Sequence, residues 1–212
     1  MGFIGSNFIR SLHNKYPTYN VCNVDSLTYA GNEENLRSLI ENDSDWYTFR
    51  KCDISNAKSM AEVFSEFAPE VVINFAAESH VDRSLVDTSQ FVLTNVVGVD
   101  ILLRLVREFN VERLIHISTD EVYGDVLMGN SSEDSKFNPS NPYAASKAAA
   151  DLLVQSVIKS HAVPAIVVRG SNNFGPRQYP EKLIPLIITN ILSGEKIPLH
   201  GDGSHMRTWL HV

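Results

Sequence analysis

The sequence has few cysteines and no excess of basic residues. Its 212 residues include two cysteines, 18 Lys and Arg, and 25 Asp and Glu, which gives a net charge of −7. A nucleic-acid-binding surface needs clustered positive charge, so this balance argues against nucleic acid as a partner. Cys22 and Cys52 both fall in predicted strands. We interpret them as buried thiols in a reducing, cytoplasmic compartment rather than as a disulfide or metal ligands.

The sequence also lacks long apolar runs and a secretion signal. No run approaches the roughly 20 apolar residues that span a bilayer, so no membrane segment is expected. Residues 1–10 have neither a basic start nor a cleavage site, which argues against a signal peptide. The composition is that of an ordinary globular protein, 43% hydrophobic and 20% charged, and the length suits one domain or one domain and part of another.

Short apolar segments alternate with helical patterns along the chain. The expected strands are residues 20–25, 47–52, 71–75, 114–118 and 165–169. The expected helices are residues 6–15, 59–67, 91–109 and 143–161, and the turn-rich stretch 128–141 is expected to be a surface loop. This alternation predicts an α/β fold of the Rossmann-like type, a doubly wound parallel sheet that binds ligands at the carboxyl ends of its strands.

The two ends of the sequence are unusual for such a fold. The glycine-containing residues 1–6 have no strand before them, and the chain closes on the strand-like residues 209–212. In the strand order 3-2-1-4-5-6 the first strand is central. Without it, the two neighbouring strands would have unpaired edges. We therefore expect a sheet that is missing its first strand.

A glycine turn followed by a helix predicts a dinucleotide site. Gly2 and Gly5 precede an expected helix, where the backbone and the helix N-terminus can approach a pyrophosphate. Asp25 ends the next expected strand, 20 residues after Gly5. A carboxylate there would bind the ribose hydroxyls and repel a 2′-phosphate, which favours NAD over NADP. The alternative is an ordinary turn with an aspartate at a strand end.

Two later strand ends add candidate cofactor contacts. Asp53 and Ile54 follow one expected strand and could contact adenine, or Asp53 could cap the next helix. Ala76 and Ala77, after Phe75, are small enough to press against a dinucleotide or to pack tightly in the core.

Tyr143 and Lys147 are four residues apart at the start of an expected helix, so their side chains share a face. A phenol acting as a base near pH 7 needs its pKa lowered by about 3 units, or roughly 4 kcal/mol. An ammonium group about 5 Å away would supply about 3 kcal/mol at an effective dielectric of about 20, and the positive nicotinamide ring could supply much of the rest. Tyr143 is therefore a candidate base and Lys147 its activator. The alternative is a solvated helix face.

Thr119, Asp120 and Glu121 follow the strand that would face the reacting part of the cofactor. Thr119 can bond a substrate hydroxyl, and two adjacent carboxyl groups can divide acid and base roles between them. Hydride transfer alone needs only a hydroxyl and the tyrosine. The acidic pair therefore indicates further proton chemistry, such as elimination of water. The alternative is a polar loop that leaves a strand.

These residues lie in segments that resemble the extended short-chain dehydrogenase/reductase family and, within it, the dTDP-glucose 4,6-dehydratases. The matching segments are residues 23–32, 76–84, 118–124, 141–147, 171–176 and 180–185. Segments 119–121 and 180–185 separate these dehydratases from the 4-epimerases and decarboxylases of the same fold. The resemblance covers nearly the whole chain.

The resemblance implies a cycle in which dTDP-glucose becomes dTDP-4-keto-6-deoxyglucose. Tyr143 would deprotonate the 4-hydroxyl while hydride leaves C4 for NAD. Glu121 would then remove the C5 proton, and Asp120 would protonate the departing 6-hydroxyl. Hydride returns to C6, so NAD is regenerated.

The resemblance also extends the set of candidate site residues. The expected catalytic residues are Thr119, Asp120, Glu121, Tyr143 and Lys147. The expected cofactor contacts are Gly2, Phe3, Ile4, Gly5, Asp25, Ser26, Leu27, Thr28, Asp53, Ile54, Phe75, Ala76, Ala77, Ser79, Thr94, Tyr143, Lys147 and Asn173. The expected substrate contacts are Ser79, Thr119, Asn172, Lys182, Leu183, Pro198, Leu199, His200 and Arg207. No metal site is expected.

The resemblance further implies an NAD-binding domain over residues 1–170, incomplete at its start, and part of a sugar-nucleotide-binding region over residues 171–212. It suggests a homodimer formed through the helices 91–109 and 143–161. The sequence departs from the family at His200, where a tyrosine is usual, and at Thr208, where an aspartate is usual. The Thr-Gly-Gly that opens the phosphate loop and roughly the last third of the family's length are absent.

Three functions are compatible with these patterns. The first is a sugar-nucleotide 4,6-dehydratase. The second is another NAD-dependent enzyme of the same fold, such as an epimerase or decarboxylase. The third is a cofactor-binding fragment without turnover.

We predict that the 212-residue chain alone is unstable or inactive and that NAD binding requires about 8–10 further residues upstream, the length of a strand and a turn. The measurement is NAD affinity and thermal unfolding of the chain with and without an upstream strand and Thr-Gly-Gly. A cooperative melt and measurable NAD affinity in the 212-residue chain would overturn this prediction.

Overall fold

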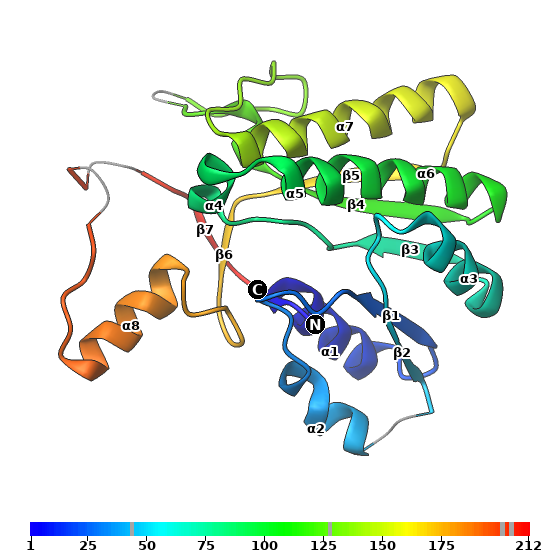
Figure 1. The fold of residues 1–212 in the computed structure, drawn as a ribbon, viewed down its shortest axis with the longest axis horizontal. Coiled ribbons are helices and arrows are strands. Elements are labelled where there is room, and N and C mark those ends of the chain that lie inside the picture. The colour runs from blue at the N-terminus through cyan, green and yellow to red at the C-terminus, as the bar shows by residue number, and fades with distance from the viewer. Residues whose placement is uncertain (43–44, 127–128, 200–201, 204–205) are drawn as a thin grey trace. The chain divides into compact units, whose positions relative to one another are not determined.

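The computed structural model describes residues 1–42, 45–126, 129–199, 202–203 and 206–212, and its helices and strands are labelled in Figure 1. By their contacts these residues form two compact units. Unit 1 consists of Met1–Asn23, Leu27–Phe49 and Ser171–Val212. Unit 2 consists of Val24–Ser26 and Arg50–Gly170. The units group residues by contact, so the division by function at residue 170 stays a prediction.

A parallel sheet forms the centre of unit 2. It contains β3 (Val71–Asn74), β4 (Arg113–Thr119) and β5 (Ala165–Gly170) in that order. Ile73 lies opposite Ile115, and Ile115 opposite Ile166, in parallel register. Because the strands are parallel, the segments that leave their carboxyl ends all start from one edge of the sheet.

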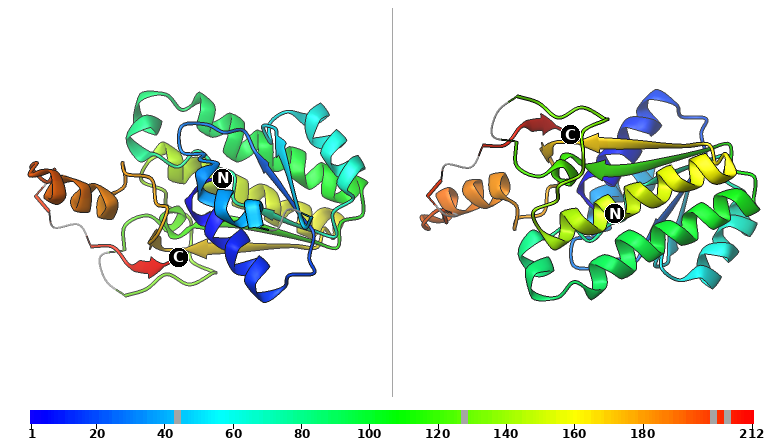
Figure 2. Two further views of the ribbon diagram at one scale, coloured as in Figure 1. Left: turned by 90° about the horizontal axis from the view of Figure 1, so that it is seen from below. Right: turned by 90° about the horizontal axis from the view of Figure 1, so that it is seen from above.

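Two long helices cover one face of this sheet. Figure 2 shows α6 (Gly98–Glu108) and α7 (Pro142–His161) side by side along the strands, and α3 (Ala57–Phe67) packs against α6. Their apolar faces meet the sheet in one core. Its fully buried side chains include Leu103, Val106, Leu114 and Val154.

Local sequence signals explain where α7 begins and how closely it packs. The Asn141 side chain accepts a hydrogen bond from the Ala144 backbone N–H (2.8 Å), and proline occupies the first helical position. Ala144 and Ala150 are fully buried, so the helix axis can approach the sheet. The helix ends where Ala162 adopts a left-handed conformation (φ 52°).

The helix preceding β4 contains a local irregularity. It runs from α5 (Ser89–Val92) through the π-helical turn η1 (Leu93–Val97) into α6, and α4 (Val81–Val86) precedes it. The expectation that no segment is long and apolar enough to span a membrane was wrong for Ser89–Glu108, a 20-residue helix. Half of its most apolar stretch is buried in the fold, which is typical of a core helix.

Unit 1 contains a smaller core. Its helices are α1 (Phe3–Lys15), α2 (Glu34–Asn42) and α8 (Leu183–Ser193), and its short strands β6 (Asn172–Phe174) and β7 (Trp209–His211) pair in parallel. The buried side chains are Met1, Ile9, Leu36 and Trp46. No described residue of α8 is buried, although the helix is mostly apolar.

Strands β1 (Val21–Asp25) and β2 (Tyr47–Lys51) pair with one another. The Val21 N–H donates to the Trp46 carbonyl (2.7 Å), and the Cys52 N–H donates to the Asp25 carbonyl (3.2 Å). The first bond joins the starts of the two strands and the second joins their ends, so the strands run parallel. Cys22 lies in β1 and is only half-buried, while Cys52 directly follows β2 and is buried; the two are not joined in a disulfide.

The predicted α/β class with parallel sheets is confirmed, and each of the five expected strands is present within two residues of its expected bounds. The described strands form separate sheets, β1-β2 and β3-β4-β5. No pattern in the sequence predicted α2, α4, α8 or β6.

We predict that Gly98→Ala lowers the free energy of unfolding by about 1–3 kcal/mol. A Cβ on Gly98 would lie 2.6 Å from Cγ1 of the buried Ile54, so Ile54 would have to move. Chemical denaturation of Gly98→Ala, Ile54→Ala and the double variant measures the effect. The cost of Gly98→Ala should shrink when Ile54 is already alanine. A gain of about 1 kcal/mol from helix propensity alone would contradict the close packing.

Candidate active site

The carboxyl end of β4 turns directly into a short 3₁₀ helix, η2 (Asp120–Tyr123). Thr119 is buried at this junction, and its hydroxyl oxygen accepts a hydrogen bond from the Glu121 backbone N–H (3.2 Å). The hydroxyl also lies 3.4 Å from a carboxylate oxygen of Asp120. Thr119 thus caps the turn that presents both acidic side chains, which explains why these three residues occur together.

Glu121 is held from the start of α7. The Asn141 side-chain amide donates to a carboxylate oxygen of Glu121 (3.1 Å), while its carbonyl oxygen caps the helix. One side chain therefore sets both the helix start and the position of the acidic residue. The sequence analysis did not assign a role to Asn141, although an asparagine before a proline at a helix start is a recognisable capping signal.

Tyr143 lies in the first turn of α7, beside the η2 turn. Its backbone N–H donates to the Ser84 hydroxyl (3.3 Å), and its ring contacts Phe91 edge-on. Its side chain has a hydrogen bond with Thr119. The structure thus brings together Thr119, Glu121 and Tyr143, as expected.

The pKa of Tyr143 is raised above its usual value, chiefly by burial and then by the negative charge of Glu121. The hydrogen bond with Thr119 lowers it, but by less. Lys147 and the positive nicotinamide ring were together expected to lower this pKa, and in the protein alone it is raised instead. Burial disfavours the phenolate more strongly than its neighbours favour it.

Lys147 is buried, with 3% of its surface exposed, one turn after Tyr143 on α7. Its ammonium group donates to the Ile117 carbonyl of β4 (2.7 Å). Burial lowers the pKa of this ammonium group to about 8, and the carboxylate of Asp151 acts in the opposite direction. Lys147 is thus a cation fixed between α7 and β4.

A buried asparagine joins three segments around the tyrosine. Asn95, in the π-helical turn, bonds the backbone N–H and carbonyl of Glu78 (2.9 and 3.0 Å) and donates to the Ser146 hydroxyl (2.9 Å). Ser146 in turn donates to the Tyr143 carbonyl (2.7 Å). A π-helical turn commonly marks a functional site, because it redirects one side chain without ending the helix. No sequence pattern that we used identifies Asn95.

The predicted cofactor residues of unit 2 lie at strand ends. Asp25 ends β1 and Ser26 follows it, while the backbone bond from Cys52 to Asp25 brings Asp53 close to that end. Asp53 accepts hydrogen bonds from the N–H and hydroxyl of Ser55, so it stabilises a turn. The cap of α3 is Asn56, and the alternative that Asp53 caps this helix is wrong.

Ile54 is largely buried against Gly98, as the close Cβ approach there shows. Its side chain belongs to the core, so only a small part of the Ile54 surface is available for the predicted contact with adenine.

The segment after β3 is fixed by Asn74. The side-chain carbonyl oxygen of Asn74 accepts a hydrogen bond from the Ala76 backbone N–H (3.0 Å). Phe75, Ala76 and Ala77 therefore leave the strand in a defined turn. Ser79 follows in the same loop, which Asn95 holds at Glu78, and the predicted contact Thr94 lies in the π-helical turn beside Asn95.

Unit 1 carries the remaining cofactor candidates. Gly2 is the N-cap of α1, and Phe3, Ile4 and Gly5 form its first turn. No side chain caps this helix, and an added Cβ on Gly2 would meet open space. Leu27 adopts a left-handed backbone (φ 54°) before Thr28 and packs on the core of this unit.

Most predicted substrate residues also belong to unit 1. Asn172 and Asn173 lie on β6 and pair with Trp209 and Leu210 of β7. Arg207 precedes β7 and donates to the Met206 carbonyl. The other candidates in this unit flank or follow α8 and are Lys182, Leu183, Pro198 and Leu199. His200 lies outside the described residues.

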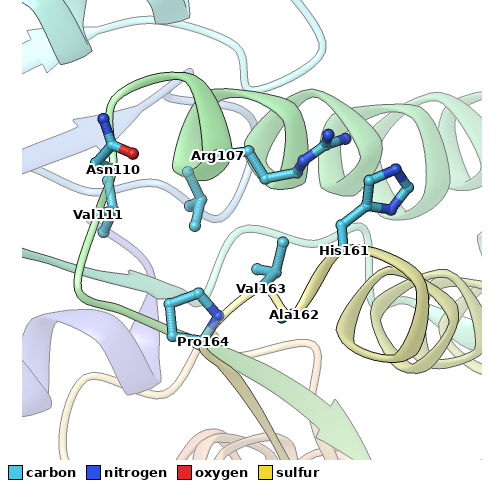
Figure 3. A pocket seen from close by; sticks show the side chains of 8 residues that line it. Arg107, Asn110, Val111, His161, Ala162, Val163 and Pro164 are labelled. Atoms are coloured by element: carbon cyan, nitrogen blue, oxygen red, sulfur yellow. The ribbon is translucent and has the colours of Figure 1, made fainter.

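A surface hollow of about 350 Å³ lies at the opposite end of the unit 2 strands. Figure 3 shows Arg107 and His161 on its walls, where α6 and α7 end and β4 and β5 begin. It is remote from Thr119, at the far end of β4. Among the described residues no group of three or more His, Cys, Asp or Glu could hold a metal ion.

The whole chain is similar to known proteins. The sequence matches the GDP-mannose 4,6-dehydratase family over residues 1–212. It is 44% identical to the low-salt glycan biosynthesis protein Agl12 of Haloferax volcanii and 43% identical to dTDP-glucose 4,6-dehydratase 1 of Escherichia coli. Both alignments cover 100% of this chain, and they cover 66% and 63% of the two relatives.

A solved structure agrees with these relatives. The chain superposes on dTDP-glucose 4,6-dehydratase of Bacillus anthracis, solved in complex with NAD, with a TM-score of 0.90 and 44% identity. The superposition covers 99% of this chain and 64% of that structure, so the chain spans less than two thirds of its length. The resemblance seen in the sequence is therefore confirmed over all 212 residues, and the chain belongs to the GDP-mannose 4,6-dehydratase family.

Proposed function

We propose that this protein is an NAD-dependent sugar-nucleotide 4,6-dehydratase, a hydro-lyase that converts dTDP-glucose to dTDP-4-keto-6-deoxyglucose. The observation that carries the proposal is the pair Asp120 and Glu121 held on one capped turn beside Tyr143 and Lys147. A tyrosine and lysine serve oxidation and reduction. Two further carboxyl groups at the same place add the acid and base that elimination of water requires.

The residues of each unit fit a dinucleotide. In unit 1 the uncapped N-terminus of the 13-residue helix α1 and the open space at Gly2 suit a pyrophosphate. In unit 2 the Asp25 carboxylate at the end of β1 suits ribose hydroxyls, which supports NAD rather than NADP. Tyr143 and Lys147 supply a hydroxyl and an ammonium group for the second ribose.

The side chains divide the chemistry among themselves. NAD, when bound, would accept hydride from C4 of the sugar and return it to C6. Tyr143 would take the proton of the 4-hydroxyl, and the positive charge of Lys147 favours the resulting phenolate. Thr119, bonded to Tyr143, would orient that hydroxyl.

The two carboxyl groups have different environments. The Asn141 amide donates a hydrogen bond to Glu121, which fixes the position of the carboxylate that would remove the C5 proton. Asp120 has the Thr119 hydroxyl 3.4 Å away and would protonate the departing 6-hydroxyl. Acid and base thus come from adjacent residues of one rigid turn.

The nucleotide, location and assembly belong to the same proposal. The dTDP-glucose 4,6-dehydratases matched above support thymidine as the base. Exposed apolar side chains on Ser89–Glu108 and α7, among them Val92, Val97 and Leu152, support a homodimer through these helices. We propose a cytoplasmic location because the enzyme would act on a soluble nucleotide sugar.

Incubation of NAD and dTDP-glucose with the full chain, meaning the 212 residues together with the upstream strand and Thr-Gly-Gly of the first prediction, tests the function directly. The expected product is the 4-keto-6-deoxy sugar nucleotide, detected by mass spectrometry as a loss of water. A 4-epimer or a pentose product would replace the dehydratase proposal with an epimerase or decarboxylase. No conversion together with tight NAD binding would indicate a cofactor-binding protein without turnover.

We predict that Glu121→Gln and Asp120→Asn stop the reaction at different steps. Each should lower kcat by about 10²–10⁴-fold, because each removes a proton-transfer group. In deuterated water, Asp120→Asn should still exchange the C5 proton, whereas Glu121→Gln should oxidise C4 without C5 exchange. NMR of the recovered sugar separates the two outcomes. Equal C5 exchange in both variants would contradict the assignment of Glu121 as the base.

We also predict that activity falls above about pH 8, where Lys147 loses its proton. Burial lowers this pKa from its usual 10.5, so the ammonium is present below about pH 8 and is lost as the pH rises through that value. The measurement is log kcat between pH 6 and 10 with saturating NAD. An activity that stays level to pH 10 would contradict a required Lys147 cation.

A further inference from the structure

A buried carboxylate lies one helical turn beyond Lys147. Asp151 is on α7, four residues after Lys147, and none of its surface is exposed. Residues at this spacing share a helix face. A carboxylate is kept buried only where charges or hydrogen bonds offset its desolvation. The proposed chemistry does not use Asp151, so its burial requires another explanation.

Arg169 of β5 is the direct partner of this carboxylate. Its Nε donates to Oδ2 of Asp151 (2.7 Å), and its Nη1 donates to the Tyr123 hydroxyl (2.8 Å). The guanidinium carbon also lies 5.5 Å from the ring centroid of Tyr123 and 5.0 Å from that of Phe137. Tyr123 is the last residue of η2, so this pair links α7 to the turn that bears Asp120 and Glu121.

His116 of β4 faces the other oxygen of Asp151. The side-chain oxygen of Asn74 accepts a hydrogen bond from the Ala76 N–H. The side-chain nitrogen of Asn74 therefore points toward Nδ1 of His116, 3.2 Å away. Because an amide nitrogen only donates, Nδ1 must accept, and the ring proton is on Nε2. That N–H lies 3.8 Å from Oδ1 of Asp151.

The neutral form of His116 agrees with its surroundings. The residue is 1% exposed, and burial together with the Lys147 charge lowers its pKa to about 3. The structure places three charged or titratable groups around Asp151: Lys147 on its own helix, His116 on β4 and Arg169 on β5. Near neutral pH His116 adds a dipole but no charge, so the carboxylate stands between two cations.

We propose that Asp151, bonded to Arg169, is a positioning residue that acts on Lys147 through space: its negative charge, one helical turn away on the same buried helix face, keeps the ammonium group of Lys147 protonated. This role rests on the proposed function for its catalytic consequence, but the electrostatic effect on Lys147 does not depend on the substrate. Lys147 is buried. The groups that act on its ammonium are the Ile117 carbonyl, the neutral ring of His116 and the carboxylate of Asp151. Of these, only Asp151 supplies a negative charge.

The test is the titration of Lys147 in Asp151→Asn, measured on the full chain by NMR of the lysine side chain, with Lys147→Met to assign the signal. Asparagine keeps an oxygen for Arg169 and removes the charge. We expect the titration midpoint of Lys147 to fall by at least about one pH unit. The alkaline limb of log kcat should move to lower pH by the same amount, so that activity at pH 8 drops about fivefold or more while activity at pH 6.5 changes less.

The matched control is Asp100→Asn, which removes an aspartate paired with an arginine on the exposed surface of α6. It should leave the Lys147 midpoint and the pH profile unchanged. If the single variant does not fold, a second variant, Asp151→Asn with Arg169→Met, removes both members of the ion pair, so that Arg169 is not left without its partner. It should lower the Lys147 midpoint in the same way.

An unchanged Lys147 midpoint in a folded Asp151 variant overturns the proposal. A lower midpoint with an unchanged pH profile overturns its catalytic part. If the unmodified protein does not dehydrate dTDP-glucose, the proposed function fails, while the Lys147 titration still decides the role of Asp151.

Discussion

The ammonium group of Lys147 is buried between a helix and a strand, and much of unit 2 is arranged around it. It bonds the Ile117 carbonyl of β4, so α7 cannot slide along the sheet without breaking a charged hydrogen bond. A buried cation is costly unless it is compensated, and it constrains which residues can surround it. The same helix places Tyr143 one turn before Lys147 and Asp151 one turn after it. Base, cation and counter-charge thus share a helix face, and their spacing is fixed by helix geometry.

Two asparagine side chains connect this helix to the rest of the site. Asn141 starts α7 and holds Glu121, while Asn95 fixes the Glu78 loop and, through Ser146, the carbonyl of Tyr143. Both use donor and acceptor ends at once, which only an amide side chain of this length can do. The acidic turn, the loop after β3 and the catalytic helix are therefore oriented by the same few hydrogen bonds. The proposed elimination of water would need an acid and a base in fixed positions, and this network would hold them.

Much of this arrangement could be predicted from the sequence, because it depends on local patterns. The apolar segments predicted the strands, and the Tyr143–Lys147 spacing predicted a shared helix face. The Thr119–Glu121 segment pointed to proton chemistry, and its capped turn is present. What the sequence could not predict are long-range contacts of polar residues that carry no pattern of their own. Arg169 is 18 residues from Asp151 in sequence, and Asn95 is 51 from Ser146. The rise in the pKa of Tyr143 in the protein alone was not predicted, because the sequence does not reveal how deeply the phenol is buried.

The central claim is that hydride leaves C4 and returns to C6 of one sugar while Glu121 and Asp120 remove water between these steps. Conversion of dTDP-glucose labelled with deuterium at C4 tests it most directly, with the full chain and unlabelled NAD. The account predicts a 4-keto-6-deoxy product in which the deuterium is found at C6, located by NMR. Deuterium retained at C4 of an epimerised sugar, or lost to the solvent, would contradict it.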